Sequence, residues 1–307
     1  MPRIITITPN PTYDYSVDAD FVEPNRKLRC RNPQRHPGGG GINVARAALR
    51  LGADVLAIFT VGGLYGDALM GLVAEEHIPA CAIRVKGETR LAFHVQDLAH
   101  HHEYRFNLPG EPMSKIDVDH ILDAVCEQMR EGDFIVGSGS LPPGETDDFW
   151  AKAARAAKMV GARFVLDSVS GVEQALAEGV YLLRQNIHEY QALAGHALKW
   201  PEEIEAFARH IVSKGSAKRY IITHGSDGSI LASNNRTILA QAHDVGMASA
   251  VGAGDSFVGA FLVALLRGWS EPEALRYASA AAAATRMTPG TSLFRAEVVD
   301  KLYKSAN

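Results

Sequence analysis

Short runs of β-branched and aliphatic residues alternate along the chain with longer segments whose apolar residues recur at helical spacing. Each run suits a strand buried in a sheet, and each longer segment suits a helix that covers it. Such alternation is typical of α/β proteins. The expected strands are residues 4–8, 54–61, 133–137, 163–167, 181–183 and 219–223, and a hairpin is expected near Ile230 and Thr237. The expected helices are the segment before Gly52 and residues 67–77, 117–130, 147–160, 201–214 and 271–287. Further helices are expected to start near residues 172, 255 and 295.

Two segments interrupt this alternation. Residues 13–36 are short, polar and broken by prolines, and residues 81–106 hold three β-like pieces, AIRV, TRLAFHVQD and EYRFN. We expect both to form a small β-sheet outside the main one, a lid over the ligand crevice. The α/β core then consists of residues 1–12, 37–80 and 107–307, and the lid of residues 13–36 and 81–106.

Composition narrows the class of protein. The 307 residues are 47% hydrophobic, enough for one large core or two modest ones. The net charge is −4 and basic residues are scattered, so neither nucleic acid nor membrane is expected as a partner. The cysteines, Cys30, Cys81 and Cys126, lack CxxC spacing, which argues against a disulfide framework or zinc and favours a reducing cytoplasm. We expect no signal peptide and no membrane span.

The stretch AVGAGDSFVG, at residues 250–259, combines three features of an anion site. Gly252 and Gly254 allow close approach of the backbone, an apolar helix follows, and helix-start amides favour a negative charge. A carboxylate beside such a site disfavours phosphate, so Asp255 is expected to take a proton from a hydroxyl nucleophile. The alternative is that Asp255 merely caps the helix.

Other candidates follow the expected strand ends, where ligands of α/β proteins bind. Asp14 and the SGSLPPG run from Ser138 lie there, and four glycines, Gly38 to Gly41, precede a helix that carries Asn43. Close approach of the main chain to a ligand explains the glycines, and a flexible hinge is the alternative. Asp14 is a candidate for binding sugar hydroxyls; its alternative is a solvated turn.

Arg90 and Arg105 lie in two strands that we expect to pair, so cross-strand guanidinium groups would meet one phosphate. The alternative for each is a surface salt bridge. Between those strands lie His100, His101 and His102, which we interpret as a solvated turn rather than a metal site. Asn186 and Glu189, three apart at a helix start, suit magnesium held through water, or equally a helix cap. No GxxxxGK[ST] motif occurs, so a nucleotide would lie along the later strand ends.

Taken together, PGGGGINVARA, SGSLPPG and AVGAGDSFVGA resemble the PfkB group of ribokinase-like sugar kinases, from Ile4 to the last helix. KLRC at 27–30, the four glycines, and the TR and YRF segments further resemble its type-2 6-phosphofructokinase branch. The resemblance implies a doubly wound, mostly parallel sheet flanked by helices, and a β lid that often forms a homodimer contact. It also implies transfer of the ATP γ-phosphoryl group to a primary hydroxyl.

The resemblance implies residue roles as well. Asp255 would be the base, beside an anion hole of amides. The implied anion hole comprises Gly252, Ala253 and Gly254, and the implied substrate site comprises Asp14, Lys27, Gly39, Gly40, Asn43, Arg90, Arg105 and Ser138. The implied nucleotide site comprises Asn186, Thr223, Gly225, Gly228 and Gly254. Asn186 and Glu189 would hold Mg²⁺ through water.

Some residues depart from the family pattern. Arg184 and Gln185 replace Lys-Pro before Asn186, and His188 stands at a position that is usually basic, so nucleotide preference is open. Ala250 replaces a threonine. Relatives often hold a monovalent cation near Gly290, but TPGTS at 288–292 is not a close match, which leaves potassium an open alternative.

Two lid arginines make sense for a phosphorylated sugar and little sense for a neutral one. We therefore expect ATP-dependent phosphorylation of fructose 6-phosphate to fructose 1,6-bisphosphate. Tagatose-6-phosphate kinase and 1-phosphofructokinase are the near alternatives. A non-catalytic sugar-phosphate sensor is the distant one, because a sensor has no need of Asp255.

Overall fold

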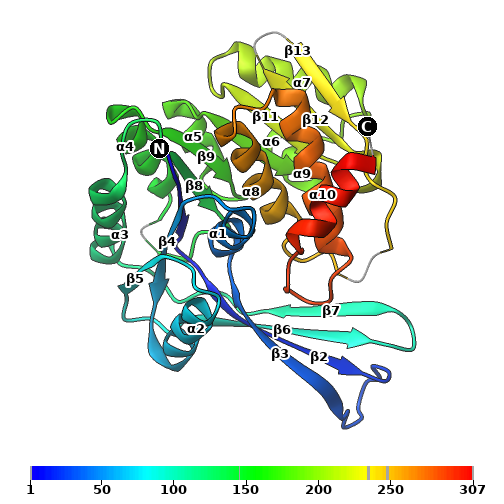
Figure 1. Cartoon of the computed structure of the whole chain (residues 1–307). Helices are drawn as coiled ribbons and strands as arrows, with labels where there is room; N and C mark the ends of the chain where they lie inside the picture. The colour runs from blue at the N-terminus through cyan, green and yellow to red at the C-terminus, as the bar shows by residue number, and fades with distance from the viewer. Residues whose placement is uncertain (1, 145, 234–235, 247–248, 306–307) are drawn as a thin grey trace.

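One large sheet of nine strands runs through the computed structural model, which describes residues 2–144, 146–233, 236–246 and 249–305. Its strands are β1 (Ile4–Thr8), β4 (Val55–Val61), β5 (Ala80–Arg84), β8 (Phe134–Ser138), β9 (Arg163–Asp167), β10 (Leu182–Asn186), β11 (Arg219–Thr223), β12 (Ser229–Ser233) and β13 (Arg236–Ala240). Their order across the sheet is β13-β12-β11-β10-β9-β8-β1-β4-β5 (Figure 1). From β11 to β5 all neighbours are parallel, and β12 and β13 add an antiparallel hairpin at one edge. The predicted mostly parallel sheet is confirmed.

Helices cover both faces of this sheet. Successive residues of a strand point to opposite faces, so the apolar side chains of each strand need a cover on both. The helices are α1 (Gly40–Arg50), α2 (Gly63–Glu75), α3 (Lys115–Gln128), α4 (Phe149–Met159), α5 (Val172–Glu178), α6 (Ile187–Ala194), α7 (Glu202–Ser213), α8 (Ala253–Leu266), α9 (Glu271–Arg286) and α10 (Ala296–Ser305). Ile4 of β1 packs with α1, α8, α9 and α10 on one face. Ile5 and Ile7 pack with α3, α4, α5 and α7 on the other. The predicted helices on both faces are therefore confirmed, and none of those in the described residues combines the length and hydrophobicity of a membrane span.

A second sheet of four strands projects from the core (Figure 1). It contains β2 (Thr12–Ala19), β3 (Cys30–Gly38), β6 (Arg90–Asp97) and β7 (His102–Asn107), in the order β3-β2-β6-β7. The expected position of the AIRV piece is wrong, because β5 pairs in parallel with β4 in the large sheet. This edge strand is only partly buried. Its pattern of hydrophobic and polar residues is therefore similar to that of a strand in an open lid.

The start of α1 lies tightly against the carboxyl ends of β1 and β8. A Cβ atom on Gly40 would lie 2.3 Å from Oγ of Ser138, and one on Gly41 would lie 2.4 Å from Oγ1 of Thr8. Gly39, the N-cap residue, has φ 115°, a conformation that glycine adopts without strain. The glycine run is therefore needed for close approach of the helix to its own sheet, and the rigid helix start argues against a hinge.

Candidate active site

Asp255 lies in the first turn of α8, where the carboxyl ends of the central strands meet the helix starts. The N-cap residue is Gly252, and Asp255 Oδ2 accepts a hydrogen bond from Nδ2 of Asn43 at 2.9 Å. Burial raises the pKa of the Asp255 carboxyl to about 7, and the negative charge of Asp167 adds to the effect. The contact with Asn43 joins α8 to the first turn of α1. The Asp255 side chain therefore bonds another helix, whereas its sequence position alone was equally consistent with a cap on α8.

The backbone before Asp255 forms a tight turn. Gly252 has φ 74°, in the left-handed region, and the amide of Ala253 makes only a long bond of 3.4 Å to the carbonyl of Ala250. The first amides of an α-helix have no acceptor within the helix. The start of α8 therefore has the backbone conformation that favours an anion beside Gly252, Ala253 and Gly254, the three residues that the sequence suggested.

Arg184, which sequence reasoning did not place in the site, lies directly beneath this turn. A Cβ atom on Gly254 would be 2.6 Å from Nη1 of Arg184. The guanidinium group donates to Oδ1 of Asp167 at 3.1 Å and to Oγ1 of Thr223 at 2.7 Å. Burial opposes its charge, but the negative charges of Asp167, Glu189 and Asp255 together raise the pKa of Arg184 above its usual value. The sequence feature that could have indicated Arg184 as a site residue is a basic side chain near a strand end, two positions before Asn186.

Asn186 and Glu189 form a reciprocal cap at the start of α6. Oδ1 of Asn186 accepts from the amides of His188 and Glu189, and Oε2 of Glu189 accepts from the amide of Asn186 at 2.7 Å. These two side chains therefore form the helix cap that the sequence analysis gave as the alternative to a magnesium site. In the described part of the chain no three His, Cys, Asp or Glu side chains converge as a metal cluster.

The carboxylates near this cap nevertheless suit a cation. Burial raises the pKa of Glu189, and the nearby charge of Asp167 raises it further. Two carboxylates that disfavour each other's ionisation are stabilised by a positive ion between or beside them. The donor set at Asn186 and Glu189 fits Mg²⁺ held through water.

A cavity of about 380 Å³ opens next to the start of α8. Arg184, Asn186, Thr223, Gly225 and Gly228 contribute one side of it. The other side is lined by α8 and by small residues of α9, with Ala253, Gly254, Phe257, Ser279, Ala282 and Ala283. The predicted nucleotide residues are therefore brought together. The alanine-rich stretch of α9 and His243, which the sequence analysis did not include, also line the cavity.

Asp14 and Ser138 bring unpartnered oxygens to the crevice. Asp14 in β2 and Ser138 at the end of β8 are both buried, and neither Oδ1 of Asp14 nor Oγ of Ser138 has a hydrogen-bond partner. Burial raises the pKa of Asp14 to about 7, against the opposing charges of Arg46 and Arg90. A Cβ atom on Gly38 would lie 2.3 Å from Oδ1 of Asp14, and one on Gly40 would lie 2.3 Å from Oγ of Ser138. Buried polar atoms without a protein partner are free to bond a ligand or a water molecule.

The expected cross-strand pairing of Arg90 with Arg105 is wrong. Arg105 lies opposite His94 in the β6–β7 register, and His94 is four residues from Arg90, or ~13 Å along the strand. Nε and Nη2 of Arg90 donate to the carbonyl of Asn10, both at 3.2 Å, which holds this guanidinium at the crevice. Arg105 forms an ion pair with Glu103. Strand register, which a single sequence does not specify, separates the two arginines.

Lys27 lies at the small sheet, away from the α/β core, whereas Ala250 lies at the cavity beside α8. Lys27 is exposed in the connection between β2 and β3, at the end of the small sheet away from the core (Figure 1). Ala250 lines the mouth of the cavity. The neighbouring Ser249 supplies a hydroxyl instead, which accepts from the amide of Val251 at 3.2 Å and donates to Glu103 at 3.1 Å. The loop before α8 is thereby tied to the small sheet.

The family assignment now has independent support. The family model described as pfkB family carbohydrate kinase matches residues 8–297. The chain belongs to this family. It is 36% identical over 305 residues to ATP-dependent 6-phosphofructokinase isozyme 2 of Escherichia coli K12, covering 99% of this chain and 98% of the relative. It is 30% identical over 283 residues to 1-phosphofructokinase of Bacillus subtilis, covering 92% of both.

Two solved structures of phosphofructokinase-2 from Escherichia coli match the whole fold. The complex with substrates and products has a TM-score of 0.94, with 35% identity over 99% of both chains. The complex with potassium has a TM-score of 0.94, with 35% identity over 100% of this chain and 99% of that one. The ribokinase-like fold and the family predicted from the motifs are thus confirmed.

Proposed function

We propose that this chain catalyses ATP-dependent phosphorylation of fructose 6-phosphate at the C1 hydroxyl, giving fructose 1,6-bisphosphate. The observation that carries the proposal is the position of Asp255. Its carboxyl, with a pKa raised to about 7, accepts a hydrogen bond from Asn43 of α1 and directly follows Gly254, which lines the nucleotide-sized cavity. The name and substrate complex of the Escherichia coli relative support the same substrate.

In this mechanism Asp255 accepts the proton of the C1 hydroxyl as its oxygen bonds to the γ-phosphorus. The bond between that phosphorus and the ADP oxygen breaks, and the electron pair leaves with ADP. The amides of Gly252, Ala253 and Gly254 face the charge that develops on the transferred group. Arg184, fixed by Asp167 and Thr223, adds a positive charge from beneath. Asn186 and Glu189 would hold Mg²⁺ through water, and the ion would neutralise phosphate charge.

The sugar phosphate would lie along the β1 and β8 ends. Asp14, Gly39, Gly40, Asn43 and Ser138 face its hydroxyls in this proposal, and Arg90 faces its phosphate. Residues 13–36 and the β6–β7 hairpin act as the lid. Arg105 would join Arg90 only after leaving Glu103, so its part depends on a rearrangement of the lid. Thr223, Gly225 and Gly228 would line the nucleotide.

We also propose a homodimer formed through the small sheet. Tyr104, Phe106 and Leu108 share one side of β7 and its extension, and all three are exposed. Exposed apolar side chains in a row favour contact with a second copy. Lys27, at the far end of the same sheet, would then reach substrate in the partner's crevice. Because ATP and sugar phosphates are cytoplasmic metabolites, we place the enzyme in the cytoplasm.

A coupled ADP-release assay tests the proposed function. Fructose 6-phosphate, fructose 1-phosphate, tagatose 6-phosphate, fructose and ribose are compared with Mg²⁺, with and without K⁺. Preference for fructose 6-phosphate supports the proposal, and preference for fructose 1-phosphate or tagatose 6-phosphate would establish the near alternatives. Turnover of the neutral sugars only would overturn the substrate class. Sugar-phosphate binding without ADP release would instead indicate a sensor.

A further inference from the structure

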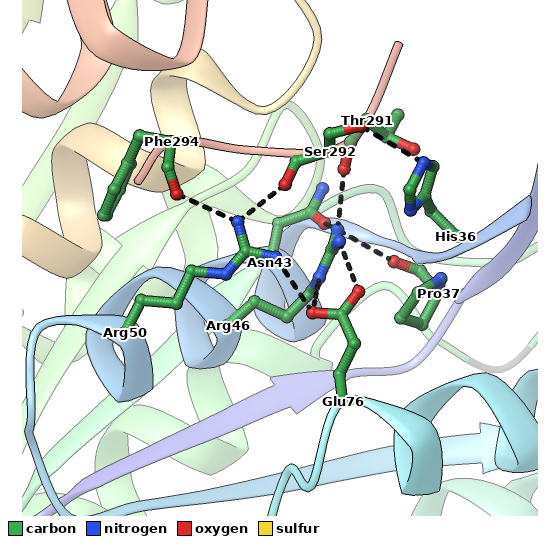
Figure 2. Close-up of polar contacts among 9 residues, drawn as sticks. All are labelled: His36, Pro37, Asn43, Arg46, Arg50, Glu76, Thr291, Ser292 and Phe294. Atoms are coloured by element: carbon green, nitrogen blue, oxygen red, sulfur yellow. Dashed lines mark hydrogen bonds and ion pairs between the residues drawn. The ribbon is translucent and has the colours of Figure 1, made fainter. Parts of the chain in front are cut away.

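The guanidinium group of Arg46, on α1, is buried at the junction of α1, α2, β3 and the segment between α9 and α10 (Figure 2). Nη1 donates to Oδ1 of Asn43 and to the carbonyl of Thr291, both at 3.0 Å, and to the carbonyl of Pro37 at 3.4 Å. Nε and Nη2 donate to Glu76 at 2.9 and 2.5 Å. An uncompensated buried cation is costly, so this full set of acceptors is needed to retain it.

Glu76 at the end of α2 neutralises Arg46 and also pairs with Arg50. Burial alone would raise the pKa of Glu76, but hydrogen bonds and charge from Arg46 hold it below its usual value. Arg50 donates to Glu76 at 3.2 Å and to the carbonyls of Ser292 and Phe294 at 2.6 and 3.0 Å. The two arginines therefore share a counter-ion and anchor the same segment, as Figure 2 shows.

The arginines differ in their relation to Asn43. Arg46 lies three residues after Asn43 on one face of α1, and donates to its carbonyl oxygen. The amide nitrogen of Asn43 is thereby left to donate to Oδ2 of Asp255. A flipped carboxamide would place two donors together at Arg46 and two acceptors together at Asp255. The buried guanidinium thus determines which end of Asn43 faces the carboxylate.

We propose that Arg46 is a positioning residue for phosphoryl transfer, which orients the Asn43 carboxamide towards Asp255. A second consequence follows from its bond to Thr291. The neighbouring Gly290 lies against β2, where an added Cβ atom would be 3.1 Å from Oγ of Ser16. Arg46 therefore also holds one wall of the crevice near Asp14. The proposal rests on the function of Asp255 proposed above.

Arg46→Lys is the test variant and Arg50→Lys is its matched control. Both keep the positive charge beside Glu76, but a single ammonium cannot reproduce the fork of bonds that a guanidinium makes. Only the first change removes a contact to Asn43. We expect Arg46→Lys to lower kcat at least ~10-fold with the KM for ATP changed less than ~2-fold, and Arg50→Lys to lower kcat less than ~3-fold. Equal losses in the two variants would overturn the proposal.

A double-mutant cycle separates positioning from general damage. In an Asn43→Ala background Arg46 has no carboxamide to orient, so Arg46→Lys should cost less than ~2-fold further in kcat. An undiminished loss in that background would show that Arg46 acts by another route and would overturn the proposal.

The pH dependence of kcat gives a further readout. Besides Asn43, Asp255 faces Asp167, Arg184 and Glu189, while Glu76, Arg50, His36 and Asp14 surround Arg46. Because the Asn43 hydrogen bond lowers the pKa of Asp255, its loss should move the acid limb of the Arg46→Lys profile upward. Arg50→Lys should leave the limb unchanged, and an unmoved limb in Arg46→Lys would count against the proposal.

Nuclear magnetic resonance of the substrate-free protein, labelled with ¹⁵N-asparagine, tests orientation without turnover. The wild type should show one slowly exchanging pair of Asn43 side-chain amide protons, which Arg46→Lys displaces and Arg50→Lys does not. Rapid exchange in the wild type would overturn the proposal even if the variants fail to fold. A wild type that turns over no sugar but shows this signature would remove the proposed function and leave the orientation standing.

Discussion

At the scale of single residues, Asp255 is positioned where ionisation is costly. Asp167 and Glu189 face it, Arg184 lies beneath the same turn, and the amide of Asn43 is its hydrogen-bond donor. A group whose pKa is raised to about 7 is half-ionised near neutral pH, where a general base is most effective. The same burial lowers the free energy of unfolding above that pH, where the Asp255 carboxyl is ionised.

Replacing Asp255 by Asn tests its role as base. The amide keeps the shape of the side chain and cannot accept the hydroxyl proton, so kcat should fall by about 10³-fold or more while sugar-phosphate binding persists. Steady-state kinetics and isothermal titration calorimetry measure the two quantities. Wild-type turnover in the Asp255→Asn protein would remove this residue from the mechanism.

The pH dependence of the wild type follows from the same carboxyl. Because the base must be ionised and the pKa of about 7 is that of the ligand-free protein, kcat/KM measured across pH should rise through a midpoint near 7.

Stability should change in the opposite sense. The folded-state pKa of Asp255 lies above the unfolded value, so its contribution to stability is present below about pH 4 and is lost as pH rises towards 7. Asp255→Asn should therefore raise Tm at pH 8 relative to the wild type, and have little effect at pH 4. A lower Tm at pH 8 would contradict this account of the buried charge.

Glu189 is the second residue with a distinct prediction. Glu189→Gln retains a side chain that can bond the amide of Asn186 but removes the negative charge. We expect the Mg²⁺ concentration for half-maximal activity to rise several-fold, with Tm nearly unchanged. Activity titrated against Mg²⁺ measures this, and an unchanged midpoint would assign Glu189 to the cap alone.

At the scale of elements, the register of the small sheet decides which arginine faces the crevice. Arg90 is fixed by the carbonyl of Asn10, the residue that connects β1 to the start of the lid. Arg105 is held by Glu103, which also bonds Ser249 in the loop before α8. The lid and the catalytic turn are thus joined through one carboxylate.

Arg90→Ala should raise the KM for the phosphorylated sugar at least ~10-fold, because a charged hydrogen bond to phosphate is lost. The KM for ATP should change less than ~2-fold. Arg84→Ala provides a matched control, since Arg84 is an exposed arginine at the end of β5 paired with Asp67. Equal effects of Arg90→Ala on both substrates would show that it does not bind the sugar phosphate.

At the scale of the whole molecule, the edge strand β7 of the small sheet leaves two aromatic side chains without a cover in one chain. Phe106 is 54% exposed and Tyr104 is 36% exposed on the same side of β7. If these residues meet a second copy, Phe106→Glu should convert a dimer to a monomer and weaken sugar-phosphate binding. Light scattering after size exclusion measures the mass. A wild-type monomer, or a dimer that the change leaves intact, would refute the proposed contact.

The sequence by itself determined the α/β class, through strand-length apolar runs that alternate with segments of helical periodicity. Its glycine-rich motifs determined the family by resemblance, and that resemblance implied the mostly parallel sheet. It also indicated Asp255 as a candidate base, because a carboxylate just after a glycine turn has few roles besides a helix cap. The capping box at Asn186 and Glu189 was foreseen as an alternative for the same reason, since spacing of three residues is a local property.

Only the tertiary structure decided how distant segments meet. It placed β5 in the large sheet, where a weakly buried edge strand has the pattern of a lid strand, and it separated Arg105 from Arg90 by register. It brought Arg184 under Gly254 and Arg46 against Thr291, contacts between residues 70 and 245 positions apart. Pairing, register and burial depend on packing of whole elements, and no window of local sequence contains that information.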